Sequence, residues 1–180
     1  MKKNIIKISK FALVLAVLFL LAGFISCVSY SADGKDAGLF VEKIEGLSKD
    51  FVMGADISSI LSLEESGVVF KNAEGKPADI FTTLKKSGIS SIRIRVWNNP
   101  FDDQGRGFGG GNVDINRAVE IGKRASTAKM SVMLDFHYSD FWADPSKQQA
   151  PRAWQGMSID EKSQALYEYT KKSILKALDA

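Results

Sequence analysis

Two segments of the chain alternate between apolar side chains and polar, charged or aromatic ones. In residues 89–97 one parity holds Ile92, Ile94 and Val96, and the other holds Arg93, Arg95 and Trp97. In residues 130–138 one parity holds Val132, Leu134, Phe136 and Tyr138, and the other holds Ser131, Met133, Asp135 and His137. A period of two residues predicts β-strands over both segments, and the largely apolar residues 51–57 predict a strand before them.

A helical spacing of apolar residues follows each predicted strand. Helices are predicted over 79–87, where Gly88 provides the stop, and over 113–128. Ser158 and Glu161 match a capping box and predict a third helix that runs to the end of the chain. Strand, loop and helix therefore alternate three times, which predicts an α/β fold with a parallel sheet.

Two architectures fit three strand–helix units: a doubly wound sheet and a (β/α)8 TIM barrel. The loops after the strands are long, and because such loops build the active face of a barrel, they favour the barrel. A complete barrel takes about 250 residues, whereas residues 27–180 hold only three units. We expect either a smaller fold or about the first three βα units of a barrel, in a domain over residues 51–180.

The first 26 residues have the pattern of an export signal. Residues 1–10 are rich in lysine, residues 11–25 carry no charge, and no acidic residue precedes Cys27. The uncharged run is shorter than the about 20 apolar residues that span a bilayer, so it predicts a signal peptide over 1–26 rather than a membrane-spanning helix. We expect an extracellular or cell-surface protein.

Cys27 is the only cysteine and follows this leader directly. The segment Phe24-Ile25-Ser26-Cys27 resembles a bacterial lipobox, with Phe24 at a position that is usually leucine. Lipidation of Cys27 would anchor the protein; the alternative is an incidental cysteine in a leader that is cleaved further on, near Ala32. Residues 27–50 predict a tether and lead-in, so membrane contact is expected only through the leader or the anchor.

The composition excludes several classes of function. One cysteine in 180 residues leaves neither a disulfide framework nor a zinc site of several cysteines, and the sequence contains no other cluster of metal ligands. The formal charge of +3 comes from the lysines of the first ten residues, and the remaining acidic and basic residues nearly balance. We therefore expect no metal, no cofactor and no nucleic-acid partner.

Charged and aromatic side chains occur at the ends of two predicted strands. Arg95 and Trp97 end the second strand, and Asp135 and His137 end the third. Because a buried charge is costly unless it is paired, they predict either a polar cleft at the carboxyl ends of the strands or a structural Arg–Asp ion pair. His137 is interpreted as a donor to a substrate hydroxyl or as a satisfied histidine under a loop; Ser139 is too close in sequence for a hydrolase triad.

The loop that starts at Ser139 interleaves aromatic rings with charged groups. Its members include Asp140, Phe141, Trp142, Asp144 and Lys147, with Trp154 further on. Exposed rings stack on sugar faces while carboxylates and lysine bind hydroxyls, so the loop predicts a carbohydrate site; the alternative is that its rings fold back over the helices.

Residues 105–110 match G-x-G-x-x-G, but neither a strand nor a helix adjoins them directly, which indicates a flexible rim loop.

Three segments of the chain resemble glycoside hydrolase family 53, the endo-β-1,4-galactanases that act on arabinogalactan. They are Gly54-Ala-Asp-Ile-Ser-Ser59, Arg93-Ile-Arg-Val-Trp-Asn98 and Leu134-Asp-Phe-His-Tyr-Ser-Asp-Phe-Trp-Ala-Asp-Pro145. The resemblance runs from about Phe51 to the end of the chain. It implies a (β/α)8 barrel and retaining hydrolysis by two glutamates, at the ends of the fourth and seventh strands, whose carboxyl groups lie about 5 Å apart.

The resemblance also implies that the catalytic pair lies outside these residues. No Asn-Glu dipeptide, which the family carries at its acid/base, occurs in the sequence, so both glutamates and any calcium site of the family would lie beyond Ala180. We expect no catalytic residue and no activity from the 180 residues alone. The alternatives are a surface-tethered carbohydrate-binding lipoprotein without catalysis, and another retaining glycosidase of the same clan, acting on mannan or xylan.

Part of the substrate cleft is assigned to this chain by the resemblance. Arg95 matches the arginine that helps to hold the nucleophile. The residues expected to bind substrate are Arg95, Trp97, Asp135, His137, Asp140, Trp142, Asp144, Pro145, Ser146 and Lys147. The implied partner is pectic galactan, bound by a protein that is a monomer when complete.

Overall fold

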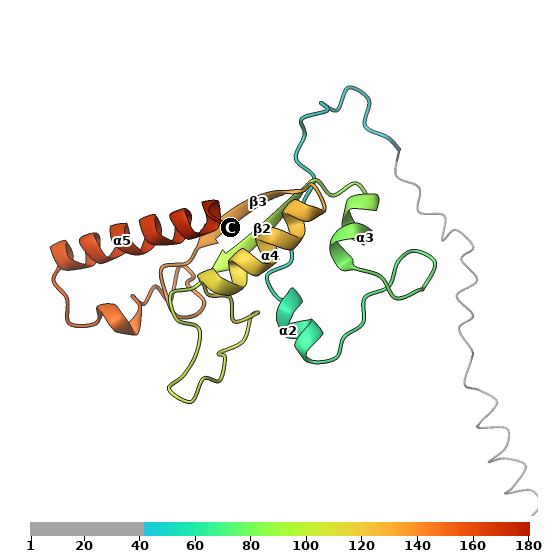
Figure 1. The fold of residues 1–180 in the computed structure, drawn as a ribbon. Coiled ribbons are helices and arrows are strands. Elements are labelled where there is room, and N and C mark those ends of the chain that lie inside the picture. The colour runs from blue at the N-terminus through green and yellow to red at the C-terminus, as the bar shows by residue number, and fades with distance from the viewer. Residues whose placement is uncertain (1–41) are drawn as a thin grey trace, which may run out of the picture. The chain divides into compact units, whose positions relative to one another are not determined.

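The computed structural model describes residues 42–180 (Figure 1). The predicted signal peptide and the predicted lipidation site at Cys27 lie outside the described residues. Residues 47–180 form one compact unit. Residues 42–46 belong to the other unit of the chain, and a turn is the only structure in this short stretch.

A three-stranded parallel sheet in the order β1-β2-β3 forms the centre of this unit. Its strands are β1 (Gly54–Asp56), β2 (Ser91–Val96) and β3 (Ser131–Phe136). The register pairs Asp56 with Arg93 and Arg95 with Asp135. Strands that are consecutive in the chain are therefore neighbours in the sheet, which confirms the predicted parallel sheet and places the three carboxyl ends along one edge.

Helices follow each strand, as the helical spacing predicts. They are α2 (Ile60–Glu65) and α3 (Ile80–Lys86) after β1, α4 (Ile115–Thr127) after β2, and a 3-10 helix (Arg152–Trp154) and α5 (Ile159–Leu178) after β3. We refer to residues 97–114 as the second loop and to residues 137–158 as the third loop. The predicted βα units are thus present, with boundaries within a few residues of those expected from the sequence.

Side-chain caps explain where three of the helices begin. The Asp79 carboxylate accepts a hydrogen bond from the Thr82 backbone N–H at 2.8 Å, and the Asp114 carboxylate accepts one from Arg117 at 2.9 Å. At α5, Ser158 and Glu161 form the predicted capping box. These contacts satisfy N–H groups that have no partner inside a helix, so a few residues of sequence are enough to fix each start.

The sequence predicts only a loop between β1 and α3, whereas the structure has α2 there. This helix has six residues and no side-chain cap, so local signals do not reveal it. Ile60 and Leu61 are buried against the core. Glu64 pairs with Arg124 of α4 at 2.7 Å, and Glu65 pairs with Arg117 of the same helix at 2.7 Å. Packing and long-range ion pairs therefore stabilise α2.

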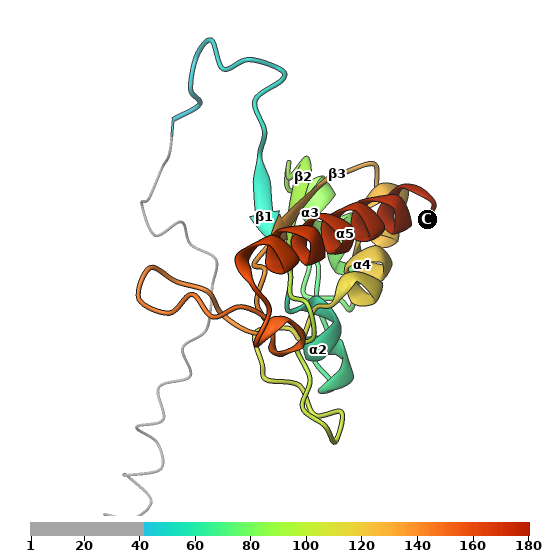
Figure 2. The same cartoon turned by 90° about the vertical axis from the view of Figure 1, so that its left-hand side faces the viewer.

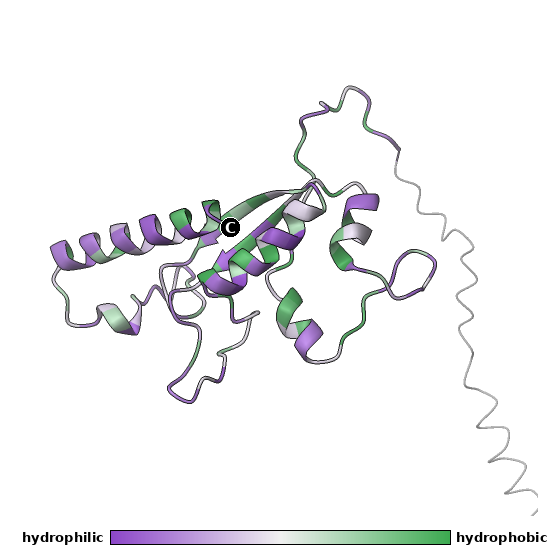
Figure 3. Ribbon diagram, in the orientation of Figure 1, coloured by the Kyte–Doolittle hydropathy of each residue, from purple (hydrophilic) through white to green (hydrophobic). Residues whose placement is uncertain are grey.

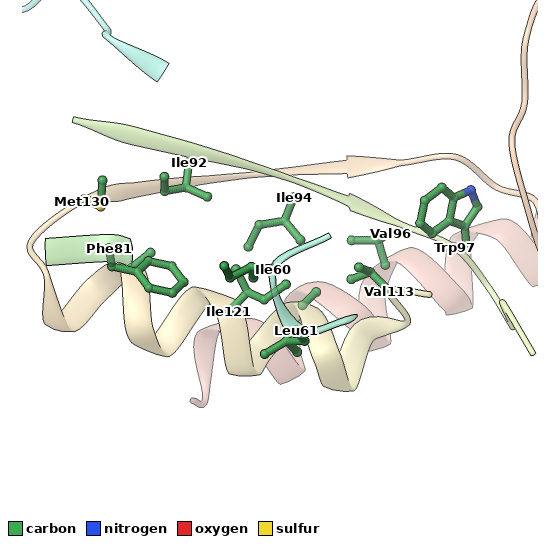
Figure 4. Packing of buried hydrophobic residues seen from close by; sticks show 12 residues of the cluster. Ile60, Leu61, Phe81, Ile92, Ile94, Val96, Trp97, Val113, Ile121 and Met130 are labelled. Atoms are coloured by element: carbon green, nitrogen blue, oxygen red, sulfur yellow. The ribbon is translucent and has the colours of Figure 1, made fainter. Parts of the chain in front are cut away.

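The hydrophobic core lies between the sheet and the helices (Figure 4). Ile92, Ile94 and Val96 of β2 are fully buried and point toward the helices, where Phe81 and Ile121 pack against them. Figure 3 shows apolar (green) and polar (purple) residues along α4 and β2. Each buried apolar side chain contributes roughly 1.5–3 kcal/mol through burial. The opposite face of β2 therefore carries Arg93 and Arg95.

The face of β3 is less completely covered than the alternation predicts. Helices α4 and α5 lie side by side along this part of the sheet (Figure 2). Val132 nevertheless remains exposed, and Leu134 and Phe136 are only half-buried, because within residues 42–180 β3 pairs with a strand along one edge only. In the same residues, no helix is both long enough and apolar enough to cross a bilayer.

Candidate functional site

Charged and aromatic side chains gather at the carboxyl ends of the strands, around Trp97 at the edge of the core. The Arg95 guanidinium lies 4.5 Å from the centre of the Trp142 ring. The His137 ring lies 5.2 Å from that of Trp97 and 5.6 Å from that of Trp142. The structure thus brings together residues of β2, the second loop and the third loop that the sequence analysis selected; their role in binding stays a prediction.

An ion-pair network crosses the three strands beside these rings. Arg93 contacts Asp56 at 2.9 Å and also pairs with Asp135, and Arg95 contacts Asp56 at 3.1 Å. All four side chains remain partly accessible to solvent. Arg–Asp pairs therefore form, as one of the two alternatives predicts, and they lie in an accessible, polar place; the cleft stays a prediction. Arg93 and Asp56 were not predicted as site residues, although Asp56 lies next to the end of one predicted strand and Arg93 lies within another.

Ser58 fixes the position of Arg95, and sequence reasoning missed it. Its hydroxyl accepts hydrogen bonds from the Arg95 backbone N–H at 2.9 Å and from Arg95 Nε at 3.2 Å. The same hydroxyl donates to Asp56 Oδ1 at 2.7 Å, and the Ser58 backbone N–H donates to that oxygen at 3.0 Å. The signal for Ser58 lay in the Gly54–Ser59 segment, which carried the family resemblance but no assigned role.

The Asp56 carboxylate stays ionised at this position. Partial burial raises the pKa of Asp56, but the hydrogen bonds from Ser58 and the charges of Arg95 and Arg93 together lower that pKa below its ordinary value. An ionised Asp56 holds both guanidinium groups. Asp56 therefore acts as an anion that positions the two arginines and not as a general acid, since a general acid would need a raised pKa.

His137 is neutral at pH 7. Its side chain is 11% exposed, its Nδ1 accepts a hydrogen bond from the Ala143 N–H at 3.5 Å, and its Nε2 lies 3.6 Å from Asp135 Oδ2. Burial lowers the pKa of His137; Asp135 opposes this effect, Arg95 and Arg93 add to it, and the net pKa is below the ordinary 6.5. Within the described residues, neither His137 Nε2 nor the buried Trp97 Nε1 has a hydrogen-bond partner.

We expect the folding stability to fall as the pH drops below about 6.5, the ordinary pKa of histidine. The folded state favours neutral His137, so the unfolded state binds the proton more tightly. The stabilisation is complete above pH 6.5 and is lost between that value and the lower folded pKa. The sole histidine gives a single NMR titration curve, whose midpoint is the pKa of His137 in the folded state. Urea unfolding of wild type and of His137→Asn at several pH values measures how the free energy of unfolding changes with pH. A titration midpoint above 6.5 would contradict the assignment.

Four predicted substrate-binding residues in the third loop make contacts with the loops themselves: Asp140, Asp144, Ser146 and Lys147. The Asp140 carboxylate is buried and accepts hydrogen bonds from the backbone N–H groups of Asn99 and Arg152, at 3.0 and 2.9 Å. The Asp144 carboxylate accepts hydrogen bonds from the Ser146 N–H and hydroxyl at 2.8 and 2.6 Å, and these bonds lower the pKa of Asp144. Asp144 and Lys147 form a backbone bridge in this exposed turn.

The aromatic rings of the third loop divide between the two predicted arrangements. Trp154 is buried and lies 6.2 Å from Tyr169 of α5, so this ring does fold back over a helix. Trp142 is 40% exposed and lies beside Arg95. Trp97 is fully buried beneath it, with the ring centres 5.5 Å apart. Only Trp142 therefore combines contact with the charged residues and a ring surface that a ligand can reach.

The glycine-rich segment 105–110 lacks the strand–turn–helix surroundings of a dinucleotide-binding loop. Residues 105–110 lie within the second loop, and α4 begins only at Ile115, so no helix N-terminus follows the glycines directly. Residues 42–180 contain no group of three or more histidine, cysteine or acidic side chains close enough to bind a metal ion together.

Comparison with known proteins gives one consistent family. Residues 52–180 match the family model described as Glycosyl hydrolase family 53. The chain is 56% identical over 140 residues to the Endo-beta-1,4-galactanase of Bacillus subtilis (strain 168), and the match covers 78% of this chain and 33% of that protein. It is 44% identical over 117 residues to the Arabinogalactan endo-beta-1,4-galactanase A of Emericella nidulans, covering 65% of this chain and 31% of that protein.

Solved structures agree with the sequence comparisons. The GH53 catalytic domain of Ignisphaera aggregans matches with a TM-score of 0.76 and 38% identity, over 78% of this chain and 39% of that one. A fungal beta-1,4-galactanase structure matches with a TM-score of 0.60 and 38% identity, over 68% of this chain and 34% of that one. The chain spans about a third of the length of the curated relatives it matches. The matches confirm the (β/α)8 barrel rather than the doubly wound sheet.

Proposed function

The chain belongs to glycosyl hydrolase family 53, and we propose that it forms part of the substrate cleft of an endo-β-1,4-galactanase acting on galactan or arabinogalactan. One observation carries this proposal: Arg95, His137, Trp97 and Trp142 meet at the carboxyl ends of the strands. That is the end of a (β/α)8 barrel at which substrates bind. The names of the relatives supply the substrate class.

The chemistry of these four side chains suits a sugar. The Trp142 ring offers an apolar face, and the carbon-bound hydrogens of a galactose ring form a matching surface. His137 Nε2 and Trp97 Nε1 lie buried without partners in the described residues. Because both atoms are closed off from solvent, the proposed role of His137 as a donor to a substrate hydroxyl requires that neighbouring side chains expose Nε2 when galactan binds. The substrate roles of Asp135 and Asp144–Lys147 belong to the same proposal, whereas the buried Asp140 carboxylate is already bound by Asn99 and Arg152.

We assign hydrolysis itself to a pair of glutamates outside residues 42–180, in a retaining mechanism. Such a mechanism needs two carboxyl groups about 5–5.5 Å apart, one of them protonated near neutral pH. The carboxylates at the described site, Asp56 and Asp135, are each bound to arginine, and the lowered pKa of Asp56 argues against an acid role. A chain consisting of these 180 residues alone is therefore expected to have no hydrolytic activity.

Arg95 is proposed to hold the nucleophilic carboxylate of that pair. Two features support this role. Ser58 and Asp56 fix the Arg95 guanidinium, and stacking on Trp142 holds its positive charge at the carboxyl ends of the strands. Export through the leader, anchoring at Cys27 and an extracellular or cell-surface location are further proposals. They rest on the sequence of residues 1–27 alone.

Replacing Trp142 by alanine in the full-length protein is expected to weaken galactan binding by about 1–3 kcal/mol, on the scale of losing one aromatic stacking partner. Titration calorimetry with a galacto-oligosaccharide measures the change. Tyr167→Ala is the matched control, because Tyr167 is 56% exposed on α5, remote in sequence from the loops. Equal affinities of wild type and Trp142→Ala would remove Trp142 from the binding site.

The two alternatives give different results with the same protein. Binding of galactan without release of reducing ends, by the full-length protein, would favour a non-catalytic carbohydrate-binding lipoprotein. Preferred hydrolysis of mannan or xylan in a substrate panel would favour another retaining glycosidase of the clan. Release of galacto-oligosaccharides from galactan supports the proposed activity.

A further inference from the structure

Asp140 occupies a position where it connects three segments of the chain. It lies in the third loop, a few residues after the end of β3, and its carboxylate is largely buried. One oxygen accepts a hydrogen bond from the backbone of Asn99, in the second loop, at 3.0 Å. The other accepts bonds from the backbone N–H and Nε of Arg152, at 2.9 and 3.3 Å. A buried carboxylate is tolerated because these donors replace water.

Arg152 extends this connection across the second loop. Its Nη2 donates to the Phe101 carbonyl at 2.6 Å, and its Nη1 lies 3.7 Å from Asp103. Its guanidinium carbon lies 5.3 Å from the centre of the Phe108 ring. A single side chain in the 3-10 helix of the third loop therefore contacts the second loop at three separate places.

The second loop in turn contacts the ring of Trp142. Phe108 packs edge-on against Phe141 at 6.2 Å, and Phe141 packs edge-on against Trp142 at 6.3 Å. Gly110 approaches more closely, since a Cβ added there would lie 3.3 Å from Trp142 Nε1 and 3.2 Å from the Trp97 ring. The position of the Trp142 ring thus depends on how the second loop lies against the third.

We propose that Asp140 and Arg152 are positioning residues, which hold the second and third loops together and thereby set the place of the Trp142 ring beside Arg95. The proposal goes beyond the family assignment, which gives neither residue such a role. The test that measures galactan affinity rests on the proposed function, whereas the test that measures the position of the ring does not. The position of the ring can be measured without any ligand.

The direct test uses 19F NMR of the full chain labelled with 5-fluorotryptophan, with the Trp142 resonance assigned through Trp142→Phe. Arg152→Gln removes the guanidinium and is expected to shift and broaden this resonance. Arg152→Lys keeps the charge near Asp140 and Phe108, so it should restore the resonance in part. Arg106→Gln is the matched control, because Arg106 lies in the second loop, which Arg152 contacts, but pairs with Asp102 and has a side chain that is 76% exposed. An unchanged Trp142 resonance in Arg152→Gln would overturn the proposal.

A double-mutant cycle on galacto-oligosaccharide affinity, in the full-length protein, separates an indirect role from a direct one. If Arg152 acts through Trp142, Arg152→Gln weakens binding several-fold in the wild type and causes no further loss in Trp142→Ala. Equal losses in both backgrounds would show direct contact of Arg152 with the sugar and overturn the positioning role. If Trp142→Ala alone leaves affinity unchanged, the stacking function fails, while the 19F resonance still decides the positioning role.

Discussion

Trp97→Ala is expected to lower the free energy of unfolding by about 3–5 kcal/mol, the range for removing a large buried aromatic side chain. Trp97 is fully buried. Its ring contacts those of His137, Phe141 and Trp142 at 5.2, 6.3 and 5.5 Å. The substitution leaves a cavity under Trp142 that the surrounding loops can fill only in part. Urea unfolding followed by far-ultraviolet circular dichroism measures the change.

Trp142→Ala is the control for this substitution. The same number of atoms is removed, but Trp142 is 40% exposed, so less apolar surface returns to water and less of a cavity remains. We expect a clearly smaller loss of stability than for Trp97→Ala. Similar losses for the two variants would show that the burial of Trp97 does not set the stability of this site.

Gly111→Ala is expected to destabilise the fold by about 2–6 kcal/mol, the sum of backbone strain and overpacking. Gly111 has a φ of +105°, which L side chains rarely adopt. An added Cβ would lie 2.3 Å from the Ser58 carbonyl oxygen, so the backbone has to move. Because Ser58 positions Arg95, the displacement also reaches the candidate site. Urea unfolding measures the loss.

Gly105→Ala separates strain from collision in the same loop. Gly105 also has a positive φ, +76°, but in the described part of the chain no atom beyond its sequence neighbours lies within 4 Å of an added Cβ. This variant should show the cost of left-handed backbone alone, about 1–2 kcal/mol. If Gly111→Ala were no more destabilising than Gly105→Ala, close contact with Ser58 would not be the reason for a glycine at 111.

The candidate site illustrates how far the sequence reaches. Parity placed Arg95 and Trp97 at the end of one strand, and Asp135 and His137 at the end of the next. The sheet register then brings these ends together. Parity could not show that Trp97 is buried while Trp142 stays accessible, because that difference depends on how the second and third loops pack.

Asp56, Ser58 and Asp140 show what sequence patterns leave out. Asp56 and Ser58 contact Arg95 from positions 37 or more residues away, and these contacts exist only because β1 and β2 are neighbours. Asp140 was grouped with substrate-binding residues by its place in a ring-rich loop. In the structure its carboxylate is occupied by the Asn99 and Arg152 donors.

The sequence by itself determined the strand periods, the starts of α3, α4 and α5, and the parallel order of the βα units. These features depend on contacts between residues at most a few positions apart, such as the Ser158–Glu161 capping box, or on simple periodicity. Only the tertiary structure decided the existence of α2, the Asp56–Arg93–Asp135 network and the accessibility of Trp142. Those features arise where segments tens of residues apart meet, so their energy depends on sheet register and loop packing, which no local pattern encodes.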